Sequence, residues 1–212
     1  MPLVFRNPNQ PYETKMKLES TRQLPVSQDR AWRALNDLDV LKHCIPGCES
    51  LTQTSDGVLE AVVAMRIGPV GARFSGKVTL EDVAPPESYR LVFTGQGGAA
   101  GYAKGEARVR LEPQTPTSTE LRYTADASVG GKLAQVGSRL IESSAKKIAE
   151  EFFTRFEATL AAPQANPEPN GGEAAGTATS SAAAPSSSRP VPYLWIGAAA
   201  VLAVAAIAIY FS

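Results

Sequence analysis

The sequence predicts an α+β fold in which a curved antiparallel β-sheet is wrapped around one long C-terminal α-helix. Between residues 16 and 127, apolar and polar residues alternate with a period of two in several segments, which is typical of half-buried strands. From residue 131 to residue 160 the apolar period changes to 3.6, which is typical of an amphipathic helix. A sheet with one apolar face needs a cover, and we expect the long helix to provide it.

One strand and two short helices are expected before the main run of strands. Alternation over residues 16–24 predicts the first strand. Ser27 is expected to cap the following helix, because a serine hydroxyl accepts a hydrogen bond from a free backbone N–H of the first turn. A second short helix is expected over residues 39–43, and the Pro46-Gly47 pair ends it.

The remaining strands are expected to follow one another as a meander. Alternation predicts them over residues 59–67, 72–81, 89–93, 103–111 and 121–127, and we expect about six strands in this meander after the first strand and the short helices. Turn signals stand at Gly57, Gly68-Pro69 and Pro85-Pro86. Short turns between consecutive strands predict antiparallel pairing. The helix over residues 131–160 is expected to be continuous and about 45 Å long.

Composition divides the chain into four segments. We expect an N-terminal extension over residues 1–15, one ligand-binding domain over residues 16–162, a disordered linker rich in Pro, Ala and Ser over residues 163–192, and a transmembrane anchor over residues 193–211. The last segment has neither charge nor proline, and its length of about 28 Å is close to the thickness of a bilayer core. Aromatic residues stand at both of its ends, as at membrane interfaces.

The orientation of this anchor follows from its surroundings. Residues 1–15 contain no apolar stretch of signal-peptide length, and Arg189 precedes the anchor. Positive charge favours the cytoplasmic side of a membrane. We therefore expect a single-pass, tail-anchored protein of the cell inner membrane, with its globular domain facing the cytoplasm.

Charge and residue counts exclude several classes of function. The 21 Lys and Arg residues balance 21 Asp and Glu residues, which argues against nucleic-acid binding. Two cysteines and one histidine support neither a disulfide scaffold nor a metal site. No pair of carboxylates is expected to converge, so we assign no catalytic residue. The glycine-rich segment 95–101 lies between two strands rather than before a helix, which predicts a mobile hairpin loop near a pocket mouth rather than a phosphate site.

Small residues on the inward face of the sheet leave two interpretations of the interior. They either let the helix and sheet pack closely, with no cavity, or leave a hollow between layers that larger residues hold apart. Composition by itself favours close packing. If a hollow exists, strand alternation and helical period predict its wall, with Tyr123 as the one inward polar candidate; the predicted ligand-binding residues are Met65, Phe74, Phe93, Tyr123, Leu133, Val136, Gly137 and Leu140.

Several segments together resemble the family of the G subunit of carbon monoxide dehydrogenase. They are KHCIPGCESL, MRIGPVGARFSGKVTLEDV, YRLVFTGQGGAAGYAKGEARVRL and TELRYTADASVGGKLAQVGSRLIESSAKKIAEEFFTRF, and the likeness covers about residues 16–160. This family belongs to the helix-grip superfamily, also called SRPBCC or START-like. The resemblance implies a sheet wrapped on a C-terminal helix around an apolar cavity.

The resemblance also implies a function. It indicates an accessory protein, not an enzyme, that binds or transfers a lipophilic molecule such as a lipid or quinone. The partner would be a molybdenum-containing carbon monoxide dehydrogenase or a related hydroxylase at the membrane. No covalently bound cofactor is expected, although a quinone would be carried. Two alternatives remain: a recruitment or assembly factor with no ligand, and an enzyme acting on a small apolar substrate through Tyr123.

Overall fold

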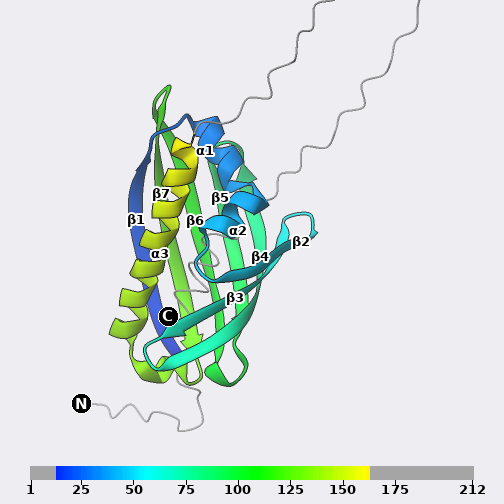
Figure 1. Ribbon diagram of the computed structural model, residues 1–212, viewed down its shortest axis with the longest axis vertical. Helices are drawn as coiled ribbons and strands as arrows, with labels where there is room; N and C mark the ends of the chain where they lie inside the picture. The colour runs from blue at the N-terminus through cyan, green and yellow to red at the C-terminus, as the bar shows by residue number, and fades with distance from the viewer. Residues whose placement is uncertain (1–12, 163–212) are drawn as a thin grey trace, which may run out of the picture.

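The computed structural model describes residues 13–162 as a seven-stranded sheet wrapped around a helix (Figure 1). The strand order is β1-β7-β6-β5-β4-β3-β2, and every neighbouring pair is antiparallel. The long N-terminal strand β1 therefore pairs with the last strand β7. The strands are β1 (Glu13–Leu24), β2 (Cys48–Ser55), β3 (Val58–Ile67), β4 (Val70–Ala84), β5 (Ser88–Gln96), β6 (Tyr102–Thr115) and β7 (Ser118–Gly130).

Three α-helices lie on the concave side of this sheet. Helices α1 (Gln28–Leu35) and α2 (Leu38–Cys44) connect β1 to β2, and α3 (Ser138–Ala161) follows β7. Short 3₁₀ turns occur at η1 (Gly98–Ala100) and η2 (Leu133–Val136). Figure 1 shows α3 running along the β1 side of the sheet, with α1 and α2 beside its C-terminal half. The Asp37 carboxylate accepts hydrogen bonds from the backbone N–H groups of Asp39 and Val40, which caps α2.

One apolar core joins the sheet to the helices. Alternate residues of each long strand face inward and are buried, as the period-two pattern predicts. On α3, the buried positions recur with helical spacing; they are Ile141, Ala145, Ala149, Phe152, Phe153, Phe156 and Leu160. The α+β class, the antiparallel curved sheet and the covering helix are thus confirmed.

The structure differs from the predictions in four respects. Strand β2 (Cys48–Ser55) was not expected, and β1 begins at Glu13, three residues before the predicted start. The predicted helix over residues 131–160 was wrong in its first turns, because α3 begins only at Ser138. Gly131 and Gly137 have φ of 88° and 97°, which α-helical backbone does not allow, so the chain makes a 3₁₀ turn between them. Ser27 precedes α1 as expected, but its side chain makes no capping hydrogen bond.

Several predicted segments lie outside the described residues. They are the first part of the N-terminal extension, the linker over residues 163–192 and the membrane anchor over residues 193–211. Among residues 13–162, none of the helices has the length and apolar character needed to cross a bilayer.

Candidate ligand-binding site

The interior beneath β4 and β5 is built from large rings that lie against glycines. Phe74 and Phe93 are each 1% exposed. A Cβ atom added to Gly105 would lie 2.4 Å from Cζ of Phe93, and one added to Gly97 would lie 1.7 Å from Cε1 of Phe74. At each of these two glycines, a phenylalanine ring therefore occupies the space that a side chain would need. This favours close packing over a hollow at those positions.

The packing against α3 changes along the helix. Its C-terminal half contributes Phe152, Phe153 and Phe156, whose rings stack or meet edge to face at centroid distances of 5.2 to 5.5 Å. The buried positions of its N-terminal half include Ala145 and Ala149. Aromatic side chains thus fill the space near α1 and α2, whereas the first half of the helix buries the smaller side chains of Ile141, Ala145 and Ala149.

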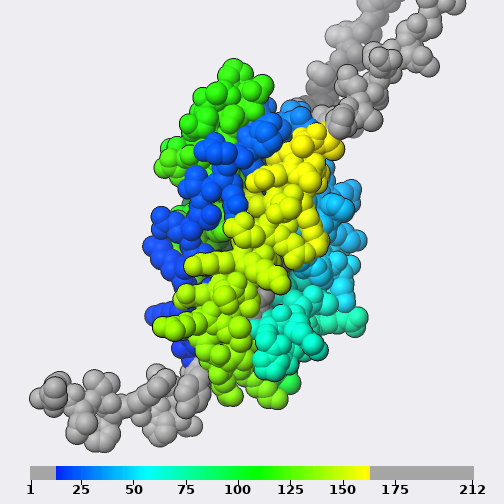
Figure 2. Space-filling view, turned by 60° about the vertical axis from the view of Figure 1, so that its left-hand side comes forward, coloured from blue at the N-terminus to red at the C-terminus, as the bar shows by residue number. Residues whose placement is uncertain are grey.

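At the end of the molecule where α3 begins, the apolar surface is only partly covered. The β3–β4 hairpin turn lies beside the first turn of α3, and Figure 2 shows these two segments adjacent on the surface. Leu140 is 38% exposed, and its Cδ2 atom lies 2.9 Å from the position of a Cβ on Gly68. We call the half-buried or exposed apolar side chains of this end the apolar rim; they are Met65, Val70, Ala72, Val136 and Leu140.

The predicted site residues therefore fall into three groups. Phe74, Phe93 and Leu133 are fully buried, and Met65, Val136 and Leu140 belong to the apolar rim. The third group is Tyr123 and Gly137. Gly137 is exposed at the start of α3, and a Cβ there would meet nothing within 4 Å.

Tyr123 lies away from the rim, against the C-terminal half of α3. It is 4% exposed and stacks on Phe153 with ring centroids 5.6 Å apart. Burial raises the pKa of its hydroxyl above the ordinary value, although a hydrogen bond with Ser20 partly offsets the rise. Tyr123 is therefore protonated at neutral pH and forms part of the packed core.

A partly buried arginine that sequence reasoning missed lies next to Tyr123. The Arg22 guanidinium stands 5.2 Å from the centre of the Phe153 ring and pairs with the Glu150 carboxylate. Its Nε atom is buried and has no hydrogen-bond partner among the described residues. The sequence could have predicted this position, because Arg22 lies an even number of positions along the chain from Leu18 and Leu24 and so points to the same inward face of β1.

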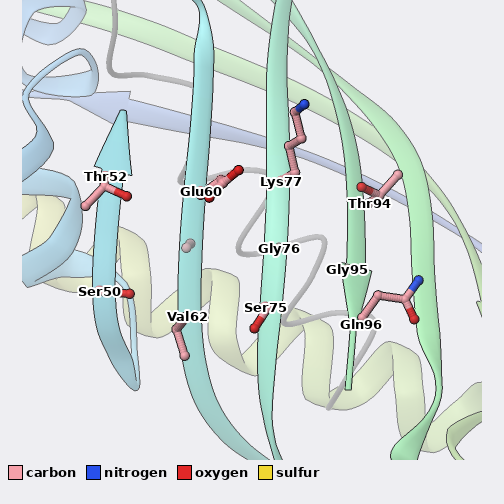
Figure 3. Close-up of a pocket in the computed structure, with 11 residues that line it drawn as sticks. Ser50, Thr52, Glu60, Val62, Ser75, Gly76, Lys77, Thr94, Gly95 and Gln96 are labelled. Carbon is pink, nitrogen blue, oxygen red and sulfur yellow. The ribbon is translucent and has the colours of Figure 1, made fainter. Parts of the chain in front are cut away.

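The outer face of the sheet has polar hollows rather than apolar ones. One, of about 440 Å³, spans β2 to β5 and is lined by hydroxyl, amide and charged groups, including Thr52, Glu60, Lys77, Thr94 and Gln96 (Figure 3). The side chains labelled there alternate along each strand with the buried side chains, so they point to the outer face of the sheet. This hollow therefore offers no continuous apolar wall to a lipophilic ligand.

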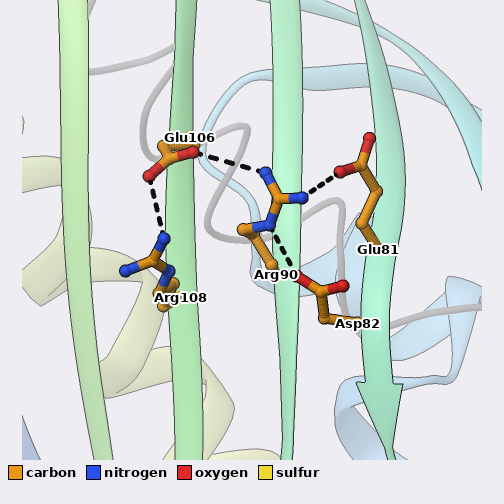
Figure 4. A network of polar contacts seen from close by, with 5 residues as sticks. All are labelled: Glu81, Asp82, Arg90, Glu106 and Arg108. Atoms are coloured by element: carbon orange, nitrogen blue, oxygen red, sulfur yellow. Dashed lines mark hydrogen bonds and ion pairs between the residues drawn. The ribbon is translucent and has the colours of Figure 1, made fainter.

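A second outer hollow, of about 330 Å³, is surrounded by arginines that are already paired. Arg90 donates to Asp82 at 2.8 Å and to Glu81 at 2.5 Å, and Glu106 bridges Arg90 to Arg108 (Figure 4). Such exposed ion pairs contribute little stability individually. Their carboxylates also neutralise the arginines locally, so the hollow is not a strong anion site.

The two cysteines among the described residues are poor nucleophiles. Burial raises the pKa of the Cys44 and Cys48 thiols, which disfavours the nucleophilic thiolate. Among residues 13–162 there is no cluster of three His, Cys, Asp or Glu side chains that could hold a metal ion. The glycine-rich segment 95–101 lies at the rim end, next to the chain that leads into α3. Gly101 and Gly131 approach so closely that a Cβ on Gly131 would lie 2.6 Å from the Gly101 Cα atom.

Several solved structures are similar to this domain. A conserved protein from Geobacillus kaustophilus is 29% identical, with a TM-score of 0.66 over 69% of this chain and 95% of that one. A START superfamily protein from Mycobacterium smegmatis is 17% identical, with a TM-score of 0.54 over 68% and 96%. The Zhui aromatase/cyclase from Streptomyces sp. R1128 is 14% identical, with a TM-score of 0.50 over 69% and 94%. The domain is thus START-like, with the helix-grip architecture.

The sequence of this domain matches one protein family. The family model for CoxG, the G subunit of carbon monoxide dehydrogenase, matches residues 21–161, and the chain belongs to this family. A search of curated proteins returned no match. Family and fold together support a role in binding a hydrophobic ligand, and the family is one of accessory subunits. Because about two thirds of this chain accounts for nearly the whole of these solved structures, that portion is a complete folding unit.

Proposed function

We propose that this protein is a membrane-tethered carrier that binds a lipophilic molecule, a quinone, and presents it to a molybdenum-containing carbon monoxide dehydrogenase or a related oxidoreductase. The partner follows from the family, whose description names carbon monoxide dehydrogenase. The tether follows from the predicted anchor over residues 193–211 and its linker. The ligand class follows from the START-like fold and from the apolar rim.

The apolar rim is the observation that carries this proposal. It connects solvent to the buried side chains of the sheet through residues that are neither charged nor polar. The contact between Leu140 and Gly68 holds the hairpin against α3. In this proposal a ligand enters between the hairpin and the start of α3 when the two move apart.

The energy of such a transfer is nearly balanced. Burying about 500 Å² of an isoprenoid tail would contribute about 12 kcal/mol before the costs of binding. The bilayer offers the tail a similar apolar environment, so the net free energy of moving it from membrane to protein is small. A carrier that must both load and unload needs this balance.

Quinone uptake by the folded domain tests the proposal. Residues 1–162 are incubated with neutral vesicles containing a menaquinone or ubiquinone, the vesicles are removed by sedimentation, and quinone in the protein fraction is measured by mass spectrometry. Uptake is expected for the unchanged domain and is expected to be lost in Val136→Arg, which places a charge on the rim. Val83→Arg is the matched control, because Val83 is as exposed as Leu140 but lies far along β4. Absence of quinone from the protein fraction would contradict carriage.

The complete burial of Phe74, Phe93 and Leu133 favours a second candidate, a recruitment or assembly factor without a ligand. In that case binding of the oxidoreductase would survive Val136→Arg, provided that circular dichroism shows the variant to be folded. In the carrier case the variant still binds the enzyme but no longer supports its reduction of membrane quinone.

A further inference from the structure

The two segments that form the rim end carry basic residues and no acidic residue of their own, although Glu13 of β1 lies beside them, opposite Gly130. Residues 64–73, which form the β3–β4 hairpin tip, include Arg66 and Arg73 and no acidic residue. Residues 127–141, which lead from β7 into α3, include Lys132 and Arg139 and again no acidic residue. All four basic side chains are exposed. The fold brings these two distant segments together at one end.

Most of these charges are not neutralised locally. Arg73 pairs with Glu49 at 2.9 Å, but no ion pair among residues 13–162 involves Arg66, Lys132 or Arg139. Arg66, Lys132 and Arg139 are therefore exposed cations without an ion-pair partner among the described residues, and they lie around the apolar rim.

We propose that this end docks on the surface of an anionic lipid bilayer, with Leu140 and Val70 entering the interface and Arg66, Lys132 and Arg139 facing lipid phosphates. A bilayer interface accepts apolar side chains and cations side by side. An acidic protein surface would satisfy the cations but would leave the apolar rim in contact with polar groups. The proposal rests on the proposed function, since it turns the entrance for a lipophilic ligand toward the membrane that dissolves it.

The dimensions of the chain are compatible with this orientation. Helix α3 has 24 residues and a length of about 36 Å, so the chain leaves the domain at the end away from the rim. The predicted linker of about 30 residues has a typical span of about 30 Å and extends to about 100 Å. It is therefore long enough for the anchor and the rim to meet the same bilayer.

Vesicle binding by residues 1–162 tests the docking surface without any contribution from the predicted anchor. The probe is quinone-free vesicles of phosphatidylcholine, with and without phosphatidylglycerol, sedimented at low and high salt. Binding is expected only with phosphatidylglycerol and is expected to weaken as salt rises. Each basic residue near an anionic surface contributes about fivefold, so Arg66→Glu with Arg139→Glu is expected to weaken binding at least about 25-fold.

Two further variants make the test specific. Lys17→Glu with Lys77→Glu makes the same charge change on the outer face and is expected to leave binding within about twofold of the unchanged domain. Leu140→Asp removes the exposed apolar side chain, and the acidic group suits the first turn of α3, so the variant is expected to fold yet bind weakly.

The possible outcomes separate docking from ligand carriage. Equal losses in the rim and outer-face variants, binding that ignores phosphatidylglycerol, or no vesicle binding at all would overturn the docking proposal. The last result combined with salt-sensitive binding to the purified oxidoreductase would assign this end to an acidic protein instead. Quinone uptake is measured separately with neutral vesicles, so failure of uptake alone contradicts the carrier function and leaves docking standing.

Discussion

Replacing Phe93 with alanine measures directly how tightly the interior is filled. The ring is 1% exposed, and its Cζ atom occupies the space that a Gly105 side chain would need. Removing it deletes most of a buried aromatic side chain and leaves a cavity that the backbone at Gly105 cannot close. Such changes cost about 3–5 kcal/mol, from lost apolar transfer together with the cavity itself. We expect Phe93→Ala to lower the free energy of unfolding of residues 1–162 by that amount.

The assay is urea unfolding followed by circular dichroism. Val83→Ala is the control, because Val83 is 38% exposed and its truncation is expected to change stability by no more than about 0.5 kcal/mol. Small domains have total stabilities of about 5–15 kcal/mol, so Phe93→Ala is close to the limit of folding. Phe93→Leu keeps most of the volume and provides a second measurement, with an expected cost below about 1.5 kcal/mol.

A cost below about 1.5 kcal/mol for Phe93→Ala would refute close packing around this ring and would indicate a pre-existing hollow. If the cost is large, the cavity in the variant becomes a probe of ligand binding. A lipophilic ligand at a hundredfold excess over its Kd restores about 2.7 kcal/mol. Recovery of stability with quinone in Phe93→Ala, but not in Phe93→Ala combined with Val136→Arg, would show that the rim gives access to this region.

Two further predictions concern the α3 junction and the buried tyrosine. Gly137→Ala is expected to lower the melting temperature and to cost about 1–2 kcal/mol of stability, because the backbone φ at Gly137 is 97°. Steric contact would not cause this loss, since nothing lies within 4 Å of the added Cβ. Ser138→Ala, one residue later in regular helix, is the control and is expected to change the melting temperature little. An unchanged melting temperature in Gly137→Ala would mean that the junction relaxes into helix. The pKa of Tyr123 is raised by burial, so its contribution to stability is complete below pH about 10, the unfolded value, and decreases as pH rises above it. Tyr123→Phe is therefore expected to lose less stability than the unchanged domain between about pH 9 and pH 11, as measured by urea titrations. If the two proteins lose stability equally over this range, the assigned burial of Tyr123 is contradicted.

Strand alternation predicted most of the sheet because each strand has one buried and one exposed face. Strand β2 was missed because only Leu51 among its eight residues is buried, so no alternation of apolar and polar residues marks it. The start of α3 was misplaced because Leu133, Val136 and Leu140 continue the helical spacing through a 3₁₀ turn. The positive φ values of Gly131 and Gly137 leave no trace in an apolar pattern.

For the candidate site too, the sequence pattern predicted some features and missed others. Strand parity and helical period placed Phe74, Phe93 and Leu133 in the interior, as the structure has them. They could not show whether small residues there leave a hollow, since that depends on which ring lies over which glycine. Phe93 over Gly105 is a contact between adjacent strands that only the register decides.

The amino-acid sequence by itself determined the fold class and the family, because periodicity and local turn chemistry act between near neighbours. It also shows that a segment rich in Pro, Ala and Ser and then an apolar segment follow the domain, which predicts a linker and an anchor. Only the tertiary structure decided that the hairpin tip and the start of α3 form one apolar, positively charged end. Those segments are more than fifty residues apart in the chain, and their charges and apolar side chains act together only once folding of the sheet has placed them side by side.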